Sequence, residues 1–157
     1  MIDPAELMRL AIEQCRHGIA LGQSPFGCAI ARDDRVVAIE HNIVLLTTDI
    51  TAHAEITALR TACRSERDIH LPGAIVATTC EPCPMCMAAL HWARVETVYY
   101  GASIADAQAA GFNEMKTPAA EVARLGGCKV RLIPGILPNE CRALFADWKA
   151  SPNPRTY

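Results

Sequence analysis

The sequence lacks any long uninterrupted apolar run, and this absence excludes a membrane-spanning helix. Its longest stretch without Asp, Glu, Lys or Arg is residues 17–31, which three glycines and a proline interrupt. A spanning helix needs about 20 consecutive apolar residues. Asp3 and Glu6 stand where a secretory signal would carry basic residues before an apolar run. We therefore expect a soluble, cytoplasmic protein.

The sequence also lacks a strong excess of charge of one sign. Fifteen basic and seventeen acidic side chains give a formal net charge of −2. This balance supplies no general attraction to a polyanion, so composition does not indicate a nucleic-acid partner, although it leaves room for a local basic patch. Hydrophobic residues make up 51% and charged residues 20% of the 157 positions, which predicts one packed domain over residues 1–157.

Cysteine is abundant, but the sequence lacks the context in which disulfides form. A chain of this length can build its own core and shows no export signal, so its eight cysteines are expected to be reduced thiols or metal ligands. Cys80, Cys83 and Cys86 fall within seven residues. The remaining five lie among apolar neighbours or at the edges of predicted elements, where we interpret them as inert small hydrophobic residues.

Hydrophobic periodicity predicts an alternation of strands and helices. Asp3, Pro4 and Glu6 form a helix-start signature, and apolar residues at helical spacing continue that helix to near Gly22. A tight turn at Asp33 joins two predicted strands into a hairpin. The pattern predicts strands over 26–31, 36–40, 74–79, 95–100 and 129–133, and helices over 52–63, 85–93 and 140–150. We expect an α/β fold, a three-layer α/β/α sandwich with a mixed five-stranded sheet.

Two segments, each at the start of a predicted helix, carry residues suited to metal chemistry. Cys83 and Cys86 are three apart, which puts both sulfurs on one face of a helical turn, and His53 supplies an imidazole. The partial positive charge of a helix N-terminus favours the thiolate that a metal requires. Three protein ligands indicate a catalytic zinc site, because a structural site is normally closed by four.

Glu55 is the candidate for moving protons beside such a metal. Residues two apart project about 200° apart around a regular helix, so His53 and Glu55 cannot face one point from mid-helix. The geometry is looser in a first turn. The hypothesis therefore requires a helix that begins near His53.

Other interpretations of these cysteines stay open from the residues alone. Cys80 could close a four-ligand structural zinc site, but Glu55 would then have no role. The Cys80, Cys83 and Cys86 spacing also matches part of an iron–sulfur sequence, although Leu90 stands where a further cysteine is expected. A redox dithiol at Cys83 and Cys86 would need neither His53 nor Glu55.

The pairing of His-Ala-Glu with Pro-Cys-x-x-Cys is the signature of zinc deaminases of nucleobases. With Thr-Ala-His-Ala-Glu, Cys-Glu-Pro-Cys-Pro-Met-Cys and the His-Trp-Ala-Arg to Val-Tyr-Tyr-Gly-Ala region, the sequence resembles the cytidine deaminase-like superfamily, in the branch of guanine deaminases and tRNA adenosine deaminases. The resemblance implies zinc held by His53, Cys83 and Cys86, with Glu55 as the catalytic acid and base. It also implies a homodimer.

The same resemblance implies a set of substrate contacts. Asn42 and Ala54 would bind a heterocycle edge, Phe26 and Trp92 would form apolar or stacking walls, and the segment containing Gly111-Phe112 resembles guanine deaminases more than tRNA enzymes. The contact residues that it implies are Asn42, Ala54, Phe26, Trp92, Glu114 and Tyr157. Residues 139–157 would form a C-terminal helix and a tail that covers the active site.

The resemblance predicts hydrolytic deamination of a purine base or related aminated heterocycle, with guanine giving xanthine and ammonia. The alternatives are a tRNA adenosine-to-inosine deaminase, a deaminase of a nucleoside or a cytosine-type base, and a catalytically silent zinc-stabilised binding module. The chain departs from the family pattern at Ile50, where proline is usual, and at Asn113-Glu114, where two aspartates are usual. The longer Glu114 side chain would fill a base pocket differently.

Overall fold

The computed structural model describes residues 2–157. Its five strands are β1 (Gly27–Arg32), β2 (Arg35–His41), β3 (Ile75–Cys80), β4 (Thr97–Ala102) and β5 (Arg131–Pro134). Its helices are α1 (Pro4–Ala20), α2 (Val44–Thr47), α3 (Ala54–Glu66), α4 (Pro84–Trp92), α5 (Ile104–Ala110), α6 (Ala119–Leu125) and α7 (Pro138–Lys149).

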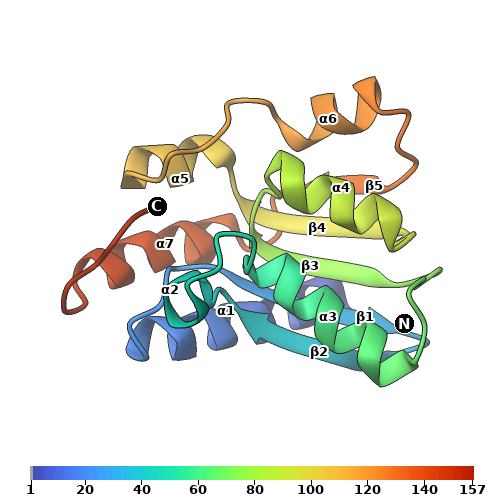
Figure 1. Cartoon of the computed structure of the whole chain (residues 1–157), viewed down its shortest axis with the longest axis horizontal. Helices are drawn as coiled ribbons and strands as arrows, with labels where there is room; N and C mark the ends of the chain where they lie inside the picture. The colour runs from blue at the N-terminus through green and yellow to red at the C-terminus, as the bar shows by residue number, and fades with distance from the viewer. Residues whose placement is uncertain (1) are drawn as a thin grey trace.

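The five strands form one mixed sheet in the order β2-β1-β3-β4-β5. Strand β1 runs antiparallel to both β2 and β3, whereas β3, β4 and β5 are parallel to one another. Helices α1 and α7 cover one face of the sheet, and α3 and α4 cover the other (Figure 1). The predicted three-layer α/β/α sandwich with a mixed five-stranded sheet is confirmed.

Helix α1 packs against β1 at very close range. Its buried face includes Met8, Ala11 and Cys15, which the helical periodicity predicted. Gly27 lies beneath this face, and a Cβ atom added there would come within 2.1 Å of the Ala11 carbonyl oxygen. The absence of a side chain at Gly27 therefore lets the helix and strand backbones approach each other.

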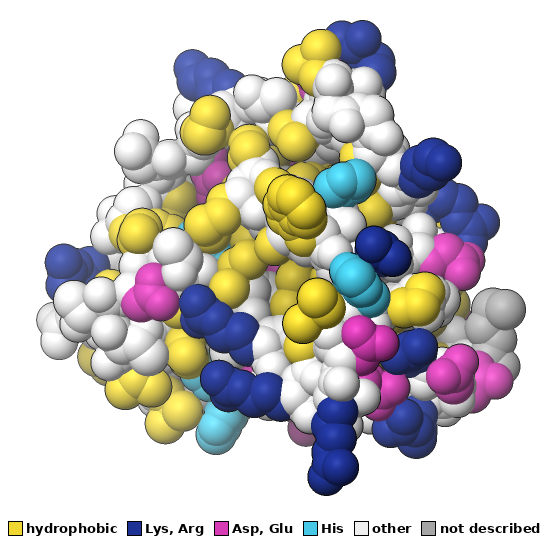
Figure 2. Space-filling view, turned by 45° about the vertical axis from the view of Figure 1, so that its right-hand side comes forward, with side chains coloured by type: hydrophobic (Ala, Val, Ile, Leu, Met, Phe, Trp, Pro, Cys, Tyr) yellow, Lys and Arg dark blue, Asp and Glu magenta, His cyan; other side chains and the backbone are white. Residues whose placement is uncertain are grey.

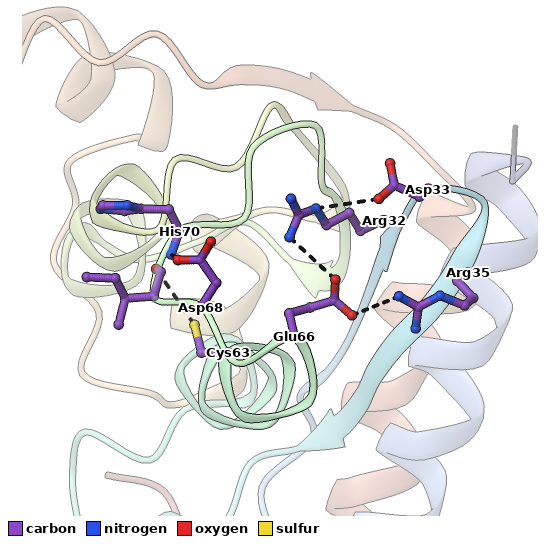
Figure 3. Close-up of polar contacts among 8 residues, drawn as sticks. Arg32, Asp33, Arg35, Cys63, Glu66, Asp68 and His70 are labelled. Atoms are coloured by element: carbon purple, nitrogen blue, oxygen red, sulfur yellow. Dashed lines mark hydrogen bonds and ion pairs between the residues drawn. The ribbon is translucent and has the colours of Figure 1, made fainter.

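The C-terminal end of α3 is tied to the hairpin of β1 and β2. The Glu66 carboxylate accepts hydrogen bonds from Arg35 at 2.9 Å and from Arg32 at 3.4 Å (Figure 3). The Glu66 side chain is only 11% exposed, so water screens this double ion pair less than it screens an open surface pair. These contacts attach the C-terminal end of α3 to the hairpin. Because a helix is rigid, they also help to position its N-terminal end.

Three short helices were absent from the predicted pattern. Helices α2, α5 and α6 have four or seven residues each, which is too few for a helical period to stand out. The other boundaries differ from prediction by up to three residues. Helix α3, for example, begins at Ala54 rather than Ala52.

Within residues 2–157, no helix is long and apolar enough to span a membrane. Hydrophobic side chains do gather on the face that Figure 2 presents, with Lys and Arg side chains around its edge. A groove beside α3 and α4 is lined by Leu59, Ile69 and Trp92, of which Ile69 and Trp92 are 74% and 78% exposed.

Candidate active site

The starts of α3 and α4 meet at the carboxyl end of β3, at the left-hand ends of these two helices near the middle of Figure 1. His53 is the residue immediately before α3, and Cys83 is the residue immediately before α4. Both have extended backbone conformations, and Pro84 occupies the first position of α4, where the missing amide proton costs nothing. Each segment thus presents a metal-binding side chain from just outside a helix.

His53, Cys83 and Cys86 form a compact cluster of potential metal ligands. The His53 Nδ1 atom lies 3.6 Å from the sulfur of Cys83 and 3.6 Å from that of Cys86, and the three ligand atoms lie within 4.8 Å of one another. Tetrahedral zinc, with Zn–S near 2.3 Å and Zn–N near 2.0–2.1 Å, requires N···S separations of about 3.6 Å. The donor set and its spacing therefore fit zinc.

Cys80 lies outside this cluster. Its thiol donates to the Ser103 carbonyl oxygen at 3.4 Å, and burial raises its pKa. Among residues 2–157, only His53, Cys83 and Cys86 form a group of three or more clustered ligand atoms. The described residues thus offer three clustered ligand atoms and not the four that the structural-zinc alternative requires.

Local hydrogen bonding favours a thiolate in this cluster. The hydrogen bond from Cys86, and to a lesser extent that from His53, lowers the pKa of the Cys83 thiol to about 4 despite burial. Burial opposes protonation of His53, but its hydrogen bond with Cys83 and the charge of Glu55 outweigh this effect and raise its pKa. Cys83 is therefore the thiolate of the cluster, the form in which a cysteine binds a metal, whereas the hydrogen bond with Cys83, followed by burial, raises the pKa of the Cys86 thiol.

Glu55 points toward the same cluster from the first turn of α3. Its carboxylate accepts hydrogen bonds from the Cys86 thiol at 3.5 Å and from the Thr78 hydroxyl at 3.1 Å. The residue is 6% exposed, and burial, followed by the charge of Cys83, raises the pKa of its carboxyl. A carboxyl with a raised pKa exchanges protons more readily near neutral pH. Because α3 begins at Ala54, the first-turn geometry that this role requires is present.

Two cavities adjoin the cluster. The outer one is about 260 Å³ and the inner one about 20 Å³, and both are bordered by His53, Cys83, Glu114 and Tyr157. The remaining outer lining is Ile50, Pro84, Met85, Phe112, Asn113 and Met115. The remaining inner lining is Phe26, Glu55, Cys80 and Glu81. Ile50 and Glu114, two of the departures from the family pattern, therefore both line the outer cavity.

Tyr157 occupies the boundary between the two cavities. Its ring centroid lies 5.5 Å from that of His53 and 5.3 Å from that of Phe112. The Asn42 amide donates to the Tyr157 hydroxyl at 2.6 Å, and the backbone amide of Asn113 donates to the Tyr157 carbonyl at 3.0 Å. The tail of this chain thus lies over its own cluster of ligands.

Asn42 is fully buried and held in a fixed orientation. Its side-chain oxygen accepts from the Val44 amide at 3.1 Å, which leaves the NH₂ group directed at Tyr157. Glu114 is half-buried at the mouth, and burial, followed by the charge of Cys83, raises the pKa of its carboxyl to about 7. Phe26 is buried and packs edge-on against Phe112, with ring centroids 5.0 Å apart.

Among the residues expected to contact substrate, Trp92 lies away from the site, whereas Ala54 and Asn42 lie beside it without lining either cavity. Trp92 is at the far, C-terminal end of α4, is 78% exposed and borders the groove beside α3 and α4, so it forms no wall of either cavity. Ala54 is fully buried as the first residue of α3 and lines neither cavity. The sequence motif places Trp92 only six residues after Cys86, but the helix carries it away from the metal-binding end.

The structure also adds residues that sequence reasoning missed. Phe112 contacts Phe26, Trp148 and Tyr157, and it forms part of the outer cavity. Its place after the positive-φ Gly111 that ends α5 was a signal, since the turn projects it back toward the core. Thr78 had no such signal, because one threonine in a buried strand is indistinguishable from another.

The fold and the cluster of ligand atoms are those of the zinc-binding deaminase family. A family model of the cytidine and deoxycytidylate deaminase zinc-binding region matches residues 1–102. The chain belongs to this family, in the branch that contains guanine deaminases and tRNA adenosine deaminases.

Individual relatives come from both parts of this branch. The guanine deaminase of Bacillus subtilis is 44% identical over 105 residues, which cover 67% of this chain and 65% of that enzyme, just under two thirds. The tRNA-specific adenosine deaminase of Agrobacterium fabrum is 39% identical over 102 residues, 65% of this chain and 67% of that enzyme. A solved guanine deaminase structure from Nitrosomonas europaea has a TM-score of 0.87 at 28% identity, covering 96% of this chain and 86% of that one.

Proposed function

We propose that this protein hydrolytically deaminates a purine base, with guanine plus water giving xanthine plus ammonia. The observation that carries the proposal is the buried Glu55 carboxyl beside the three ligand atoms of His53, Cys83 and Cys86, next to a cavity. The similarity to guanine deaminases favours guanine among the candidate bases.

His53, Cys83 and Cys86 would hold the zinc ion. When bound, zinc supplies Lewis-acid activation of water near neutral pH. His53 and Cys83 immediately precede two helices and Cys86 lies in the first turn of α4, so rigid elements hold all three ligands and little reorganisation accompanies the reaction.

Glu55 is proposed to move the protons of the reaction. Its carboxylate accepts one proton from the attacking water and delivers it to the ring nitrogen, then accepts the second proton from the hydroxyl group left on the ring carbon and delivers it to the departing amine. The hydroxyl of Thr78 holds one carboxylate oxygen, which leaves the other directed toward the cluster. This arrangement supports a single group serving as base and then as acid.

Asn42 and Glu114 are proposed to bind the base. The Asn42 NH₂ group can donate to a ring acceptor once the Tyr157 hydroxyl moves away, and the Glu114 carboxylate can accept from ring N–H and amino groups. Phe26 and Phe112 supply the apolar contacts to its ring.

The test is ammonia release by purified, zinc-loaded protein. The panel should comprise guanine, adenine, cytosine, their nucleosides and aminotriazines, with xanthine identified by chromatography. We expect guanine to give the highest kcat/KM. Absence of ammonia across the whole panel would overturn the proposal.

A tRNA adenosine deaminase is the second candidate, because the Agrobacterium fabrum relative is one. Such an enzyme must bind phosphates with Lys and Arg side chains. The described lining of the outer cavity contains neither, whereas it contains the Glu114 carboxyl, and this favours a small uncharged substrate. Inosine formation in transcribed tRNA, without turnover of free bases, would decide for the second candidate.

A further inference from the structure

Glu81 lies between the metal-binding loop and the segment that forms the cavity mouth. It follows Cys80 at the end of β3 and precedes Cys83 by two residues, and its backbone amide extends the pairing of β3 with β4 by donating to Ala102 at 2.8 Å. Its backbone is therefore fixed to the sheet, while its half-buried side chain reaches across to two other elements.

The two oxygens of the Glu81 carboxylate accept hydrogen bonds from two different helices. One accepts from the Ile104 amide at 3.0 Å and the other from the Ala119 amide at 2.9 Å. These are the first residues of α5 and α6. Pro118, which precedes α6, has no side-chain atom that can accept a hydrogen bond from the helix start. The Glu81 carboxylate, 38 residues before Ala119, accepts the hydrogen bond from the Ala119 amide instead.

The segment that joins these two helices, residues 111–118, forms one side of the cavity mouth. It carries Phe112, Asn113, Glu114 and Met115, all of which line the outer cavity. It forms no helix or strand of its own, so its position depends on the elements at its ends and on the contacts that Phe112 and Asn113 make with the core and the tail. Glu81 holds the start of the helix before it and the start of the helix after it.

We propose that Glu81 is a positioning residue that fixes residues 111–118, and with them the Glu114 carboxyl, relative to His53 and Cys83. The consequence for substrate binding rests on the proposed function, whereas the mechanical link does not. A carboxylate suits this role because it has two acceptor oxygens and no donor. Glutamine offers only one acceptor, and its NH₂ group would face a backbone N–H donor.

Glu81→Gln in zinc-loaded protein tests the mechanical link without substrate. Hydrogen–deuterium exchange followed by mass spectrometry should show faster exchange in peptides covering 111–119, by about tenfold, with exchange in α4 unchanged. Glu121→Gln is the matched control, because among residues 2–157 this α6 side chain, 41% exposed, pairs with Arg124 alone. Equal exchange in Glu81→Gln and wild type over 111–119, with zinc retained, would overturn the proposal.

Steady-state kinetics test the consequence for binding. Glu81→Gln should raise KM about tenfold while kcat changes less than about threefold, because binding geometry and not proton transfer is altered. In a Glu114→Gln background the same change should raise KM much less. An equal rise in both backgrounds, or a loss confined to kcat, would overturn a role exerted through Glu114.

Glu81→Asp covers the case in which the glutamine variant does not fold. It keeps the negative charge but is one methylene shorter, so its carboxylate cannot reach both amides. We expect the same split between KM and kcat, and wild-type values in both would contradict the proposal. If wild-type protein deaminates no base, the proposed function fails, and the exchange measurement still decides whether Glu81 holds the segment.

Discussion

Burial raises the pKa of the Glu55 carboxyl, and a carboxyl whose pKa lies nearer neutrality transfers protons more efficiently at neutral pH than an exposed one. Its enclosure raises the proton affinity of the carboxylate, while the Thr78 hydroxyl partly offsets that rise by donating to it. A single side chain can thereby accept a proton and return it near neutral pH.

Replacement of Glu55 by Gln should therefore abolish turnover without removing the metal. We expect kcat to fall by at least about 10²–10⁴-fold, because the amide cannot accept and return a proton. Zinc content, measured by atomic spectrometry, should stay at the wild-type ratio, since the three ligand side chains are unchanged. Turnover at the wild-type rate would show that another group carries the protons.

Glu114 leads to a prediction about pH and stability in metal-free protein. Its pKa rises from 4.5 to about 7 on folding, so between these values the folded chain holds a proton that the unfolded chain has released. The free energy of unfolding contributed by this group is therefore fully present below pH 4.5 and falls as pH rises toward 7. Glu114→Gln lacks this titration.

Urea unfolding at pH 5 and pH 8 measures this effect. From pH 5 to pH 8, wild type should lose about 1–2 kcal/mol relative to Glu114→Gln, a value reduced for the partial exposure of the carboxyl. A difference between the two proteins that stays constant with pH would mean that Glu114 ionises normally.

At the scale of elements, the packing of α1 against β1 leaves no room for a side chain at Gly27. A methyl group at Gly27 would have to displace the Ala11 carbonyl, which is backbone and cannot rotate away. Gly27→Ala should lower the free energy of unfolding by about 2–3 kcal/mol through overpacking, measured by chemical denaturation. A loss below about 0.5 kcal/mol would show that α1 can shift freely on the sheet.

The sequence was informative about elements wherever hydrophobic residues recur over at least two turns or along a buried strand. Thus α1, with Met8, Ala11 and Cys15 on one face, and the alternation of strands and helices were predictable. Helix α5 carries a local start signal in the Ser103–Asp106 capping box, but α5 and α6 are too short to show a period, and the Glu81 hydrogen bonds to their starts come from 23 and 38 residues away. Hydrophobic periodicity does not reveal hydrogen bonds between a side chain and a distant helix start.

The candidate site was likewise predictable from the sequence only in part. The motif brought together His53, Glu55, Cys83 and Cys86, because their spacing is set by two helix starts. Trp92 was misplaced, since proximity in sequence does not reveal which end of a helix faces the cavity. Whether the grouped residues perform the roles assigned to them stays a prediction.

For the molecule as a whole, the distribution of charge around the mouth matters more than the net charge. The lining described for the outer cavity has a carboxyl but no Lys or Arg. Activity toward free guanine should therefore change less than about twofold in kcat/KM between 50 and 200 mM salt. A phosphate-binding enzyme would lose about 10³–10⁵ in affinity over that range if it made 6–10 phosphate contacts. A loss on that scale would point back to a nucleic-acid substrate.

Homodimerisation is a prediction at the same scale that derives from the family resemblance. Sedimentation equilibrium measures it directly. A mass twice that of the 157-residue chain is expected, and a single-chain mass at micromolar concentration would contradict it.

Because the Asn42 amide donates a hydrogen bond to the Tyr157 hydroxyl, a ligand that binds this amide would have to displace the phenol ring. With the ring in place, the inner cavity of about 20 Å³ accommodates little more than a water molecule, and the amide that would read a purine edge already has a partner. If Asn42 binds a purine as proposed, the base would have to break that hydrogen bond and offer the amide a better acceptor. The Tyr157 hydroxyl would thus compete with a ligand for the Asn42 amide, so selection among ligands would begin at binding, before the chemical step.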